Sequence, residues 1–284
     1  MILFTDGGST KCDWLLLDHK GEVVLKTRTQ GLNPTVISSE EIQKRIEENS
    51  ELKEFFQLVE TLDFYGAGCG TITPRNILKD VLSSLFSKGK VKVQEDLAAA
   101  VYAVTEAPGI VCILGTGSNS CYFDGNQIHA PIPSLGYSIM DEASGNYFGK
   151  ELLRDYFYRK MPQDTAGRFE AAYNLKADDI KVNIYQKPNP NAYLASFAQF
   201  IFTEEITDSY CVSVVEKGIK EFITCRIQTF PEASNVPIHF IGSIAHFSSP
   251  IIERCLKAEG YQLGNIVRRP MDGLVAYYQR KIKE

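Results

Sequence analysis

The chain has 284 residues, enough for two domains that each bury a substantial core. Hydrophobic residues make up 44% of it and charged residues 23%, proportions typical of a globular protein. The formal net charge of −5 provides no basic surface for nucleic acid, and no apolar run approaches the ~20 residues that a membrane-spanning helix needs. We therefore expect neither nucleic acid nor a membrane as a partner.

The cysteines and histidines indicate neither disulfides nor a structural metal site. The seven cysteines form no CxxC pair, and several lie within apolar runs. Reduced, mostly buried thiols are typical of a cytoplasmic protein, which is the localisation we expect. The four histidines are scattered, without the spacing of zinc ligands on a helix.

Two apolar runs near the N-terminus flank a short glycine-rich turn, the pattern of a β-hairpin. Glycines let backbone N–H groups approach an anion, and Ser and Thr hydroxyls add hydrogen-bond donors. Asp6, at the end of the first run, offers acceptor oxygens suited to a magnesium ion. The turn predicts a phosphate loop made of Asp6, Gly7, Gly8, Ser9, Thr10 and Lys11. Two interpretations of Lys11 remain open: its side chain contacts a phosphate, or it is simply exposed to solvent.

The rest of the first half alternates between strand and helix patterns. A third strand is expected at residues 22–27 and a helix at 39–58, with Ser38 or Ser39 as its N-cap. Strands at 62–65 and 91–94 are each followed by a helix, the first starting at Thr73-Pro74 and the second at Asp96. The order is βββαβαβα.

The second half repeats this order. A second hairpin, at 110–124, has the turn Gly115, Thr116, Gly117, Ser118 and Asn119, which predicts a second phosphate loop, and a third strand follows at 127–130. A helix is expected from about Asp141 to 158, then a mainly helical insert at about 160–234, and then strands at 238–241 and 263–267 with helices at 250–258 and 271–283. This internal duplication predicts two α/β domains facing a cleft, at 1–107 and 108–284, and the C-terminal helix 271–284 could join the first.

The duplicated unit with paired glycine-rich hairpins resembles the actin–hexokinase–Hsp70 ATPase superfold, whose domains are ribonuclease H-like. The motifs are most similar to the N-acetylglucosamine kinase branch, grouped with the BadF/BadG-type ATPases, over essentially the whole chain. The resemblance implies that Asp96, in the motif at 95–100, is the catalytic base, and that Gly242 and Ser243 belong to an adenosine motif. It also implies a set of sugar-binding residues: Asn33, Asn119, Gly136 and Asp141.

The chain departs from that family's pattern at three places near the expected sugar site. Met140 and Ala143 stand where glycines are usual, and Leu135 stands where a Trp is usual. The loop at 66–70 also differs from the usual Ser-Gly-Gly. These differences leave open which amino sugar is bound: N-acetylglucosamine, N-acetylmuramic acid, glucosamine or another.

Each acidic residue also has a purely structural interpretation. Asp96 and Asp141 could be helix N-caps, and Asp6 could be a turn former at a strand end. Other nucleotide sites fit the sequence poorly, because the loop at 66–70 does not complete GxGxxG and no Walker P-loop occurs. No GxSxG elbow occurs either, so an α/β-hydrolase would have no nucleophile.

The sequence therefore predicts an ATP-dependent sugar kinase that uses Mg²⁺ and converts N-acetylglucosamine to its 6-phosphate. The alternative is an activating ATPase of the BadF/BadG type, which holds an iron–sulfur cluster through cysteines near the second phosphate loop and after it. Cys121 lies near that loop, but the next cysteine is Cys211, which favours the kinase. A sugar-sensing protein without turnover is a third option. The expected partner is a small sugar, and a homodimer is one possible assembly.

Overall fold

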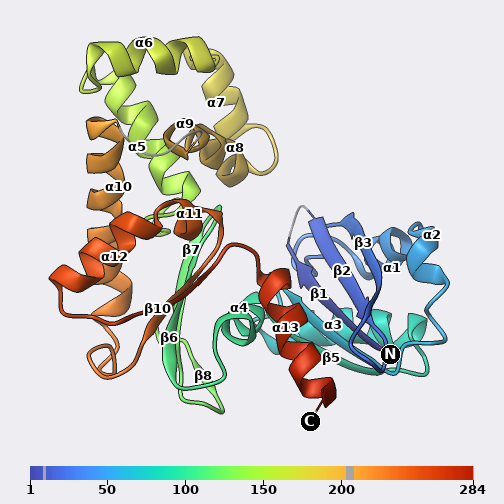
Figure 1. Ribbon diagram of the computed structural model, residues 1–284. Helices are drawn as coiled ribbons and strands as arrows, with labels where there is room; N and C mark the ends of the chain where they lie inside the picture. The colour runs from blue at the N-terminus through green and yellow to red at the C-terminus, as the bar shows by residue number, and fades with distance from the viewer. Residues whose placement is uncertain (9–10, 203–207, 284) are drawn as a thin grey trace. The chain divides into compact units, whose positions relative to one another are not determined.

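The computed structural model describes residues 1–8, 11–202 and 208–283, and the chain divides into two compact units (Figure 1). Unit 1 consists of Met1–Ala103 together with Arg269–Glu284, and unit 2 of Val104–Arg268. Among the described residues, no helix has both the length and the apolar character needed to cross a membrane.

Unit 1 is built on a mixed five-stranded sheet with the strand order β3-β2-β1-β4-β5. The central strand β1 is antiparallel to β2 and parallel to β4, which is in turn parallel to β5. The strands are β1 (Ile2–Gly7), β2 (Lys11–Leu17), β3 (Val23–Gln30), β4 (Thr61–Gly66) and β5 (Lys90–Glu95).

Helices cover both faces of this sheet, because the strand side chains of both faces are apolar. On one face Trp14 packs against Phe64 and Phe86, within a core that also contains buried residues of α1, α2 and α3. On the other face the ring of Phe4 stacks on Tyr278 of α13 with centroids 4.4 Å apart. The helices are α1 (Ser39–Glu47), α2 (Ser50–Lys53), α3 (Ile72–Leu85), α4 (Asp96–Val104) and α13 (Pro270–Lys283).

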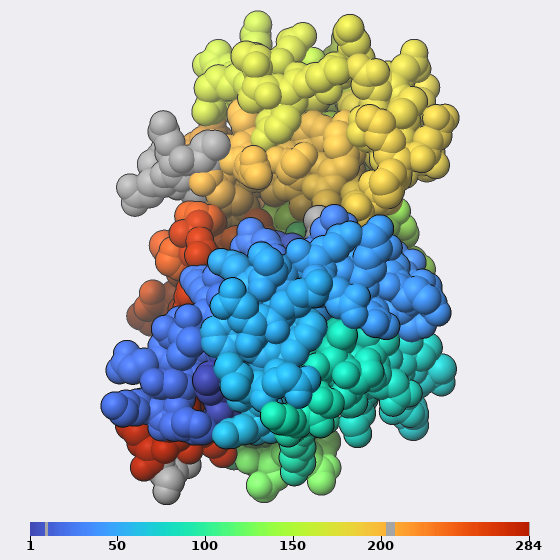
Figure 2. All heavy atoms as spheres, turned by 90° about the vertical axis from the view of Figure 1, so that its right-hand side faces the viewer, coloured from blue at the N-terminus to red at the C-terminus, as the bar shows by residue number. Residues whose placement is uncertain are grey.

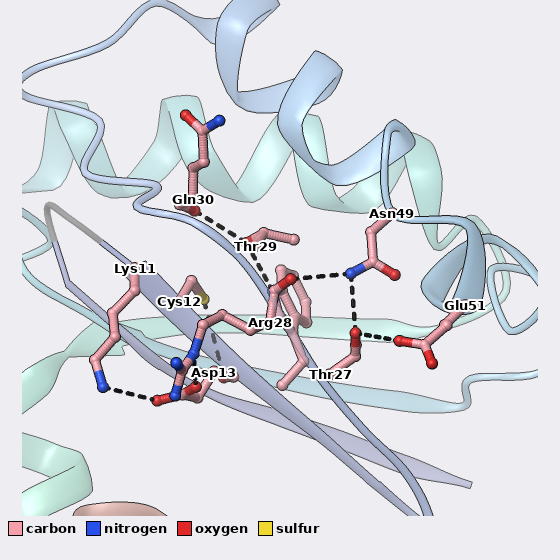
Figure 3. A network of polar contacts seen from close by, with 10 residues as sticks. Lys11, Cys12, Asp13, Thr27, Arg28, Thr29, Gln30, Asn49 and Glu51 are labelled. Atoms are coloured by element: carbon pink, nitrogen blue, oxygen red, sulfur yellow. Dashed lines mark hydrogen bonds and ion pairs between the residues drawn. The ribbon is translucent and has the colours of Figure 1, made fainter.

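The single helix expected at 39–58 is instead two helices, so that prediction was wrong in its length. Ser38 caps α1 as expected, accepting a hydrogen bond from the N–H of Glu41. Asn49 ends this first segment and caps α2, because its Oδ1 accepts from the N–H of Leu52 at 2.9 Å. Its Nδ2 also donates to the hydroxyl of Thr27 and the carbonyl of Arg28 on β3 (Figure 3). The break thus attaches the helices to the edge of the sheet.

Unit 2 repeats the topology of unit 1, which confirms the predicted duplication. Its sheet has the order β10-β9-β6-β7-β8, and β6 is antiparallel to β7 and parallel to β9, as β1 is to β2 and β4. The strands are β6 (Gly109–Leu114), β7 (Ser118–Phe123), β8 (Ile128–His129), β9 (Ile238–Ile241) and β10 (Leu263–Val267).

The insert between β8 and β9 is helical, as predicted, and Figure 2 shows side chains of α6 and α7 at its surface (yellow-green to yellow). Its core is rich in aromatic rings, with Phe169 in contact with Tyr156, Tyr173, Phe197 and Phe200. The remaining helices of unit 2 are α5 (Gly145–Phe157), α6 (Gln163–Ala172), α7 (Ala177–Tyr185), α8 (Pro190–Phe197), α9 (Gln199–Phe202), α10 (Ser209–Phe222), the π-helix η1 (Ile223–Ile227), α11 (Ser243–Phe247) and α12 (Ser249–Ala258).

Two helix starts differ from the prediction. The helix expected from Asp141 begins at Gly145, where Ser144 is the N-cap and accepts from the N–H of Tyr147. Asp141 precedes it in a left-handed conformation, with φ of 73°. Helix α3 begins at Ile72, so Pro74 is the third helical residue; its missing N–H costs nothing in the first turn.

The hydroxyl of Tyr278 anchors α13 to the sheet of unit 1, and its loss should destabilise the protein. This hydroxyl donates to Asp63 Oδ2 at 2.6 Å and lies 2.7 Å from the hydroxyl of Tyr65. Tyr278→Phe keeps the stack on Phe4 but removes a buried partner from both groups. We expect it to lower the free energy of unfolding by about 1–3 kcal/mol, measured by urea denaturation. Tyr185→Phe, at a side chain that is 81% exposed, is the control, and equal losses in the two variants would contradict the prediction.

Candidate functional site

The carboxyl ends of three parallel strands form one edge of the unit 1 sheet. Gly7 of β1 pairs with Gly66 of β4, which pairs with Glu95 of β5. Asp6 therefore lies at this edge, and so does Asp96, the first residue of α4. The structure thus brings together the predicted metal-binding and catalytic carboxylates.

Asp6 and Asp96 are close enough to interact electrostatically, and both have unusual acidities. Burial, followed by the negative charges of Asp96 and Asp13, raises the pKa of Asp6 to about 6 against the opposing charge of Lys11. Burial, followed by the charge of Glu95, raises the pKa of Asp96 to about 6. A carboxylate with a pKa near 6 is ionised at neutral pH yet basic enough to accept a proton.

Asp96 behaves as a residue at a helix start, and its proposed role as a base stays a prediction. Its carboxylate accepts hydrogen bonds from its own N–H and from that of Leu97, which is the behaviour of a residue at a helix start. These bonds fix the side chain without removing its elevated pKa, because burial outweighs them. A fixed carboxylate at a strand end can cap a helix and also orient a substrate hydroxyl.

The first glycine-rich turn lies next to Asn33. The N–H of Gly8 donates to the carbonyl of Lys11 at 2.8 Å, and the carbonyl of Gly8 accepts from Leu32 at 3.3 Å. Ser9 and Thr10, the other predicted members of this loop, lie outside the described residues. Asn33 is therefore held beside the turn, as a sugar-binding residue near a phosphate loop would be.

The loop at 66–70 supports Asn33 from the other side. Gly68 has φ of +81°, and a Cβ there would lie 2.0 Å from Asn33 Oδ1, so only glycine fits. The same Oδ1 accepts from the N–H and the hydroxyl of Thr35 at 2.9 and 2.7 Å. The amide of Asn33 is thus fixed in orientation, and the glycine pattern at 66–70 serves this contact.

Lys11 points along the sheet toward Asp13 (Figure 3). Its Nζ lies 3.5 Å from Asp13 Oδ2, while Arg28 donates to Asp13 Oδ1 at 2.5 Å. Asp13 pairs with Asp6 across β1 and β2, so the ammonium group belongs to the electrostatic surroundings of Asp6. With 59% of its side chain exposed, Lys11 remains compatible with either predicted role.

In unit 2, Asp141 holds the second glycine-rich hairpin. Its Oδ1 accepts from the N–H of Ser118 at 3.2 Å, and its Oδ2 accepts from Asn146 Nδ2 at 2.8 Å. Asn146 also donates to the carbonyl of Thr116 at 2.7 Å. A Cβ on Gly117 would lie 2.8 Å from Asp141 Oδ2, so this glycine lets the carboxylate approach. Asp141 is 6% exposed, and its two oxygens are engaged by the hairpin and by α5.

The other predicted sugar-binding residues of unit 2 make only local contacts. Asn119 Oδ1 accepts from the N–H of Ser120 at 2.9 Å. Gly136 has φ of +79° and open space around its Cα, and its carbonyl accepts from the N–H groups of Ile139 and Met140. Asn119 lies in β7 of the hairpin, whereas Gly136 belongs to the turn before Asp141.

A cavity of about 500 Å³ joins the second hairpin to the predicted adenosine motif. Gly242 has φ of +122°, and a Cβ there would lie 2.1 Å from the carbonyl of Leu114, so glycine allows β9 to pass into α11 beside the hairpin. The cavity has no charged lining residue, and its volume suits a small aromatic ligand. It is lined by Gly115, Thr116, Gly145, Ala192, Ala195, Ser196, Ala198, Gln199, Phe202, Ser243, Ile244 and Phe247.

The contribution of the insert to this cavity was missed by the sequence analysis. Residues of α8 and α9 form one wall, and Phe202 of α9 stacks near Phe247 of α11 with centroids 6.1 Å apart. The available signal was a series of small residues three apart: Ala192 and Ala195 in α8, and Ala198 at its C-terminal end. These small residues leave space beside the helix. The sequence alone does not show that this space faces the second hairpin.

Solved structures of known proteins are similar to this chain. A protein from Porphyromonas gingivalis with the provisional name N-acetylglucosamine kinase is 32% identical, with a TM-score of 0.91 over 99% of both chains. A protein of the same provisional name from Chromobacterium violaceum has 12% identity and a TM-score of 0.71, over 97% of this chain and 98% of that one. A ROK family glucokinase from Streptomyces griseus, in complex with glucose and AMPPNP, has 13% identity and a TM-score of 0.60 over 97% of both chains. No protein-family model matches the sequence, and no curated protein matches it significantly.

The raised pKa of Asp96 predicts that this residue destabilises the folded protein at neutral pH. A carboxyl whose folded pKa lies above its unfolded value binds protons more tightly when folded, so stability is lost as the pH rises from about 4 to 6. Asp96→Asn removes the buried charge and should raise the free energy of unfolding at pH 7 by about 1–3 kcal/mol. Thermal denaturation at pH 7 and pH 4.5 measures this, and the difference from wild type should shrink at the lower pH. A variant that is less stable at pH 7 would contradict the prediction.

Proposed function

Because this chain belongs to the sugar-kinase family of the Porphyromonas gingivalis protein, and is thus an ATP-dependent carbohydrate kinase, we propose that its substrate is an amino sugar. The reaction would transfer the γ-phosphoryl group of ATP to the 6-hydroxyl of N-acetylglucosamine. The 32% identity over 99% of both chains is the observation that carries this proposal. The motifs further suggest the BadF/BadG-type branch of the superfold.

Asp96 is the proposed general base. Phosphoryl transfer to a hydroxyl needs a carboxylate that accepts the proton and orients the attacking oxygen. Asp96 meets this need because it is ionised at pH 7, has a pKa of about 6, and is fixed by backbone N–H groups at the start of α4. Transfer of the proton to Asp96 would also relieve the electrostatic repulsion that it shares with Glu95 and Asp6.

The nucleotide would occupy the cavity of unit 2. The neutral lining, which combines the aromatic rings of Phe202 and Phe247 with the hairpin residues Gly115 and Thr116, suits an aromatic base followed by phosphates. Ser243, at the start of α11, adds a hydroxyl to the lining. Gly7, Gly8 and the neighbouring Ser9, Thr10 and Lys11 would form the other proposed phosphate loop.

The proposed metal ion is Mg²⁺, held by Asp6. Carboxylate oxygens suit Mg²⁺, which in kinases is held by one or two carboxylates together with phosphates and water. A cation beside Asp6 would also offset the negative charges of Asp96 and Asp13 that raise its pKa. Within the described ranges no group of three or more possible His, Cys, Asp or Glu ligands occurs, which agrees with a site completed by the nucleotide. When bound, Mg²⁺ neutralises charge on the transferred phosphoryl group.

Asn33 is the proposed reader of sugar hydroxyls on unit 1. Its side chain is fixed by Thr35 and Gly68 and lies beside the glycine-rich turn. Asn119, Gly136 and Asp141 are the corresponding proposals on unit 2. Because Asp141 already holds the hairpin, its contribution to sugar binding would be combined with positioning of that hairpin.

Loss of the carboxylate should remove catalysis while leaving binding intact. Asp96→Asn is expected to lower kcat by about 10²–10⁴-fold, the range for a lost general base, with little change in nucleotide affinity. Steady-state kinetics and calorimetric titration with ADP measure the two effects. Asp80→Asn, at an exposed position of α3, is the matched control. Turnover by Asp96→Asn within a few-fold of wild type would reduce Asp96 to a helix cap.

The amino-sugar assignment predicts strong discrimination against glucose. A site built to hydrogen-bond the N-acetyl group leaves buried polar groups unpaired when the group is missing, so kcat/KM for glucose should be lower by ~10²-fold or more. A panel of glucose, N-acetylglucosamine, glucosamine and N-acetylmuramic acid, assayed by ADP release, tests this. N-acetylmuramic acid is included because Leu135 stands where the family that the chain resembles usually has a larger Trp, which would leave room for a bulkier sugar. Equal values for glucose and N-acetylglucosamine would remove the amino-sugar assignment and leave the kinase.

A further inference from the structure

Arg226 is a buried charged residue to which the proposed reaction gives no role. Its side chain is only 1% exposed, and it lies in the π-helix η1, Ile223–Ile227, which continues α10. Short π-helical turns inside helices are often found at functional sites, because they turn a side chain out of the regular helical register. The position of Arg226 within unit 2 therefore needs an explanation.

The guanidinium group of Arg226 contacts both neighbours of Asp141. Its Nη2 lies 3.4 Å from Met140 Sδ, and its Nε lies 3.6 Å from Glu142 Oε2. Asp141 is the residue between them, whose carboxylate holds Ser118 and Asn146. Arg226 thus holds the chain on either side of the residue that fixes the second glycine-rich hairpin.

The same arginine also lies against the strands that lead into that hairpin. The hydroxyl of Ser120 on β7 donates to the carbonyl of Arg226 at 3.3 Å. The positive charge of Arg226 reaches Cys112 on β6, where it opposes the effect of burial on the thiol. Cys112 and Ser120 pair directly across β6 and β7, so η1 packs under the base of the hairpin.

The turn around Asp141 needs such support, because its backbone is in an unfavourable conformation. Ala143 has φ of 57°, a left-handed value that a residue with a Cβ adopts at a cost in free energy, and Asp141 has φ of 73°, which Asp tolerates better than most residues. Hydrogen bonds from Ser118 and Asn146 hold the carboxylate, and the Arg226–Glu142 pair holds the next residue along the chain.

The pair is buried but incompletely hydrogen-bonded. Arg226 Nη1 and Glu142 Oε2 are both buried without a hydrogen-bond partner. A buried ion pair with unsatisfied atoms is a poor way to stabilise a fold, since a well-packed apolar pair of the same volume is often as good or better. Its geometry is better explained by specificity for one conformation of the Asp141 turn.

We propose that Arg226 is a positioning residue that acts through Met140 and Glu142 on Asp141, and so fixes the hairpin at Gly115–Ser118 for nucleotide binding. This inference rests on the proposed function of that hairpin as a phosphate loop. Displacement of groups by about 1 Å can cost about 10²-fold in rate, so loss of the arginine should be costly although it is remote from the substrate.

The test uses Arg226→Met, Arg226→Lys, Glu142→Gln and the double variant Arg226→Met/Glu142→Gln. Each is compared with the control variant Arg254→Met. Arg254 is the matched control, because it makes an exposed ion pair with Glu216 at 2.9 Å on another face of unit 2. Three quantities are measured for each: the melting temperature, the affinity for ADP in the presence of MgCl₂, and kcat and KM with ATP and N-acetylglucosamine.

Arg226→Met should lower kcat/KM for ATP by about 10²-fold and weaken ADP binding, whereas Arg254→Met should change neither. Arg226→Lys should recover part of the loss. In the double variant no lone charge remains buried, so the melting temperature should partly recover while ADP binding stays weak. That separation is the signature of positioning.

Wild-type ADP affinity and kcat/KM in folded Arg226→Met, with only the melting temperature lowered, would overturn the inference. If Arg226→Met does not fold, then Glu142→Gln and Arg226→Lys decide, and wild-type ADP affinity in both would overturn it equally. Failure of the wild-type protein to phosphorylate N-acetylglucosamine would count against the proposed substrate instead, because the ADP measurements do not depend on the sugar.

Discussion

The parallel pairing of the central strand with the fourth strand is the constraint on which both candidate sites depend. Parallel strands end at the same edge of a sheet, so a hairpin turn after the first strand meets the ends of the fourth and fifth. In unit 1 this brings Asp6 and Asp96 to one edge, although ninety positions of sequence separate them. In unit 2 it brings Gly115 beside Gly242, where β6 and β9 end. The strand order therefore determines where each candidate site lies, and the side chains at that edge determine its chemistry.

The two edges share their geometry but differ in their electrostatics. In unit 1, burial and neighbouring negative charges raise the pKa values of Asp6 and Asp96 to about 6, so ionised carboxylates at this edge are energetically costly. In unit 2 the carboxylate of Asp141 accepts two hydrogen bonds, and the adjacent cavity is neutral. Costly charge is useful where a proton or a cation is to be bound, and a satisfied, rigid edge is useful where a nucleotide is to be held. The two edges of the duplicated fold therefore suit the two different tasks proposed for them.

Local patterns made most of the fold predictable from sequence. The hairpins follow from apolar runs around glycine-rich turns, and strand β9 was expected at the residues where it occurs, Ile238–Ile241. Features decided by tertiary contacts were not predictable. Asn49 breaks the helix expected at 39–58 because its side chain also bonds to β3, and Ser144 starts α5 because Asp141 is already engaged by the hairpin. The contribution of α8 and α9 to the cavity could not be predicted for the same reason. Small residues leave space beside a helix, but the sequence does not show which element lies across that space.

The departures from the resembling family's glycine pattern have a physical explanation in unit 2. Ala143 keeps the left-handed backbone that glycine would adopt without strain, with φ of 57°, and its methyl group is fully buried in the core. The strain of about 1–3 kcal/mol is thereby opposed by burial of apolar surface and by a smaller loss of chain entropy on folding. Met140 has a thioether that reaches Arg226, which glycine could not do. The two substitutions thus exchange backbone freedom for side-chain contacts, and they do so on either side of the Asp141–Glu142 turn. The turn is therefore held by the packing of Ala143 and by the contact of Met140 with the buried Arg226.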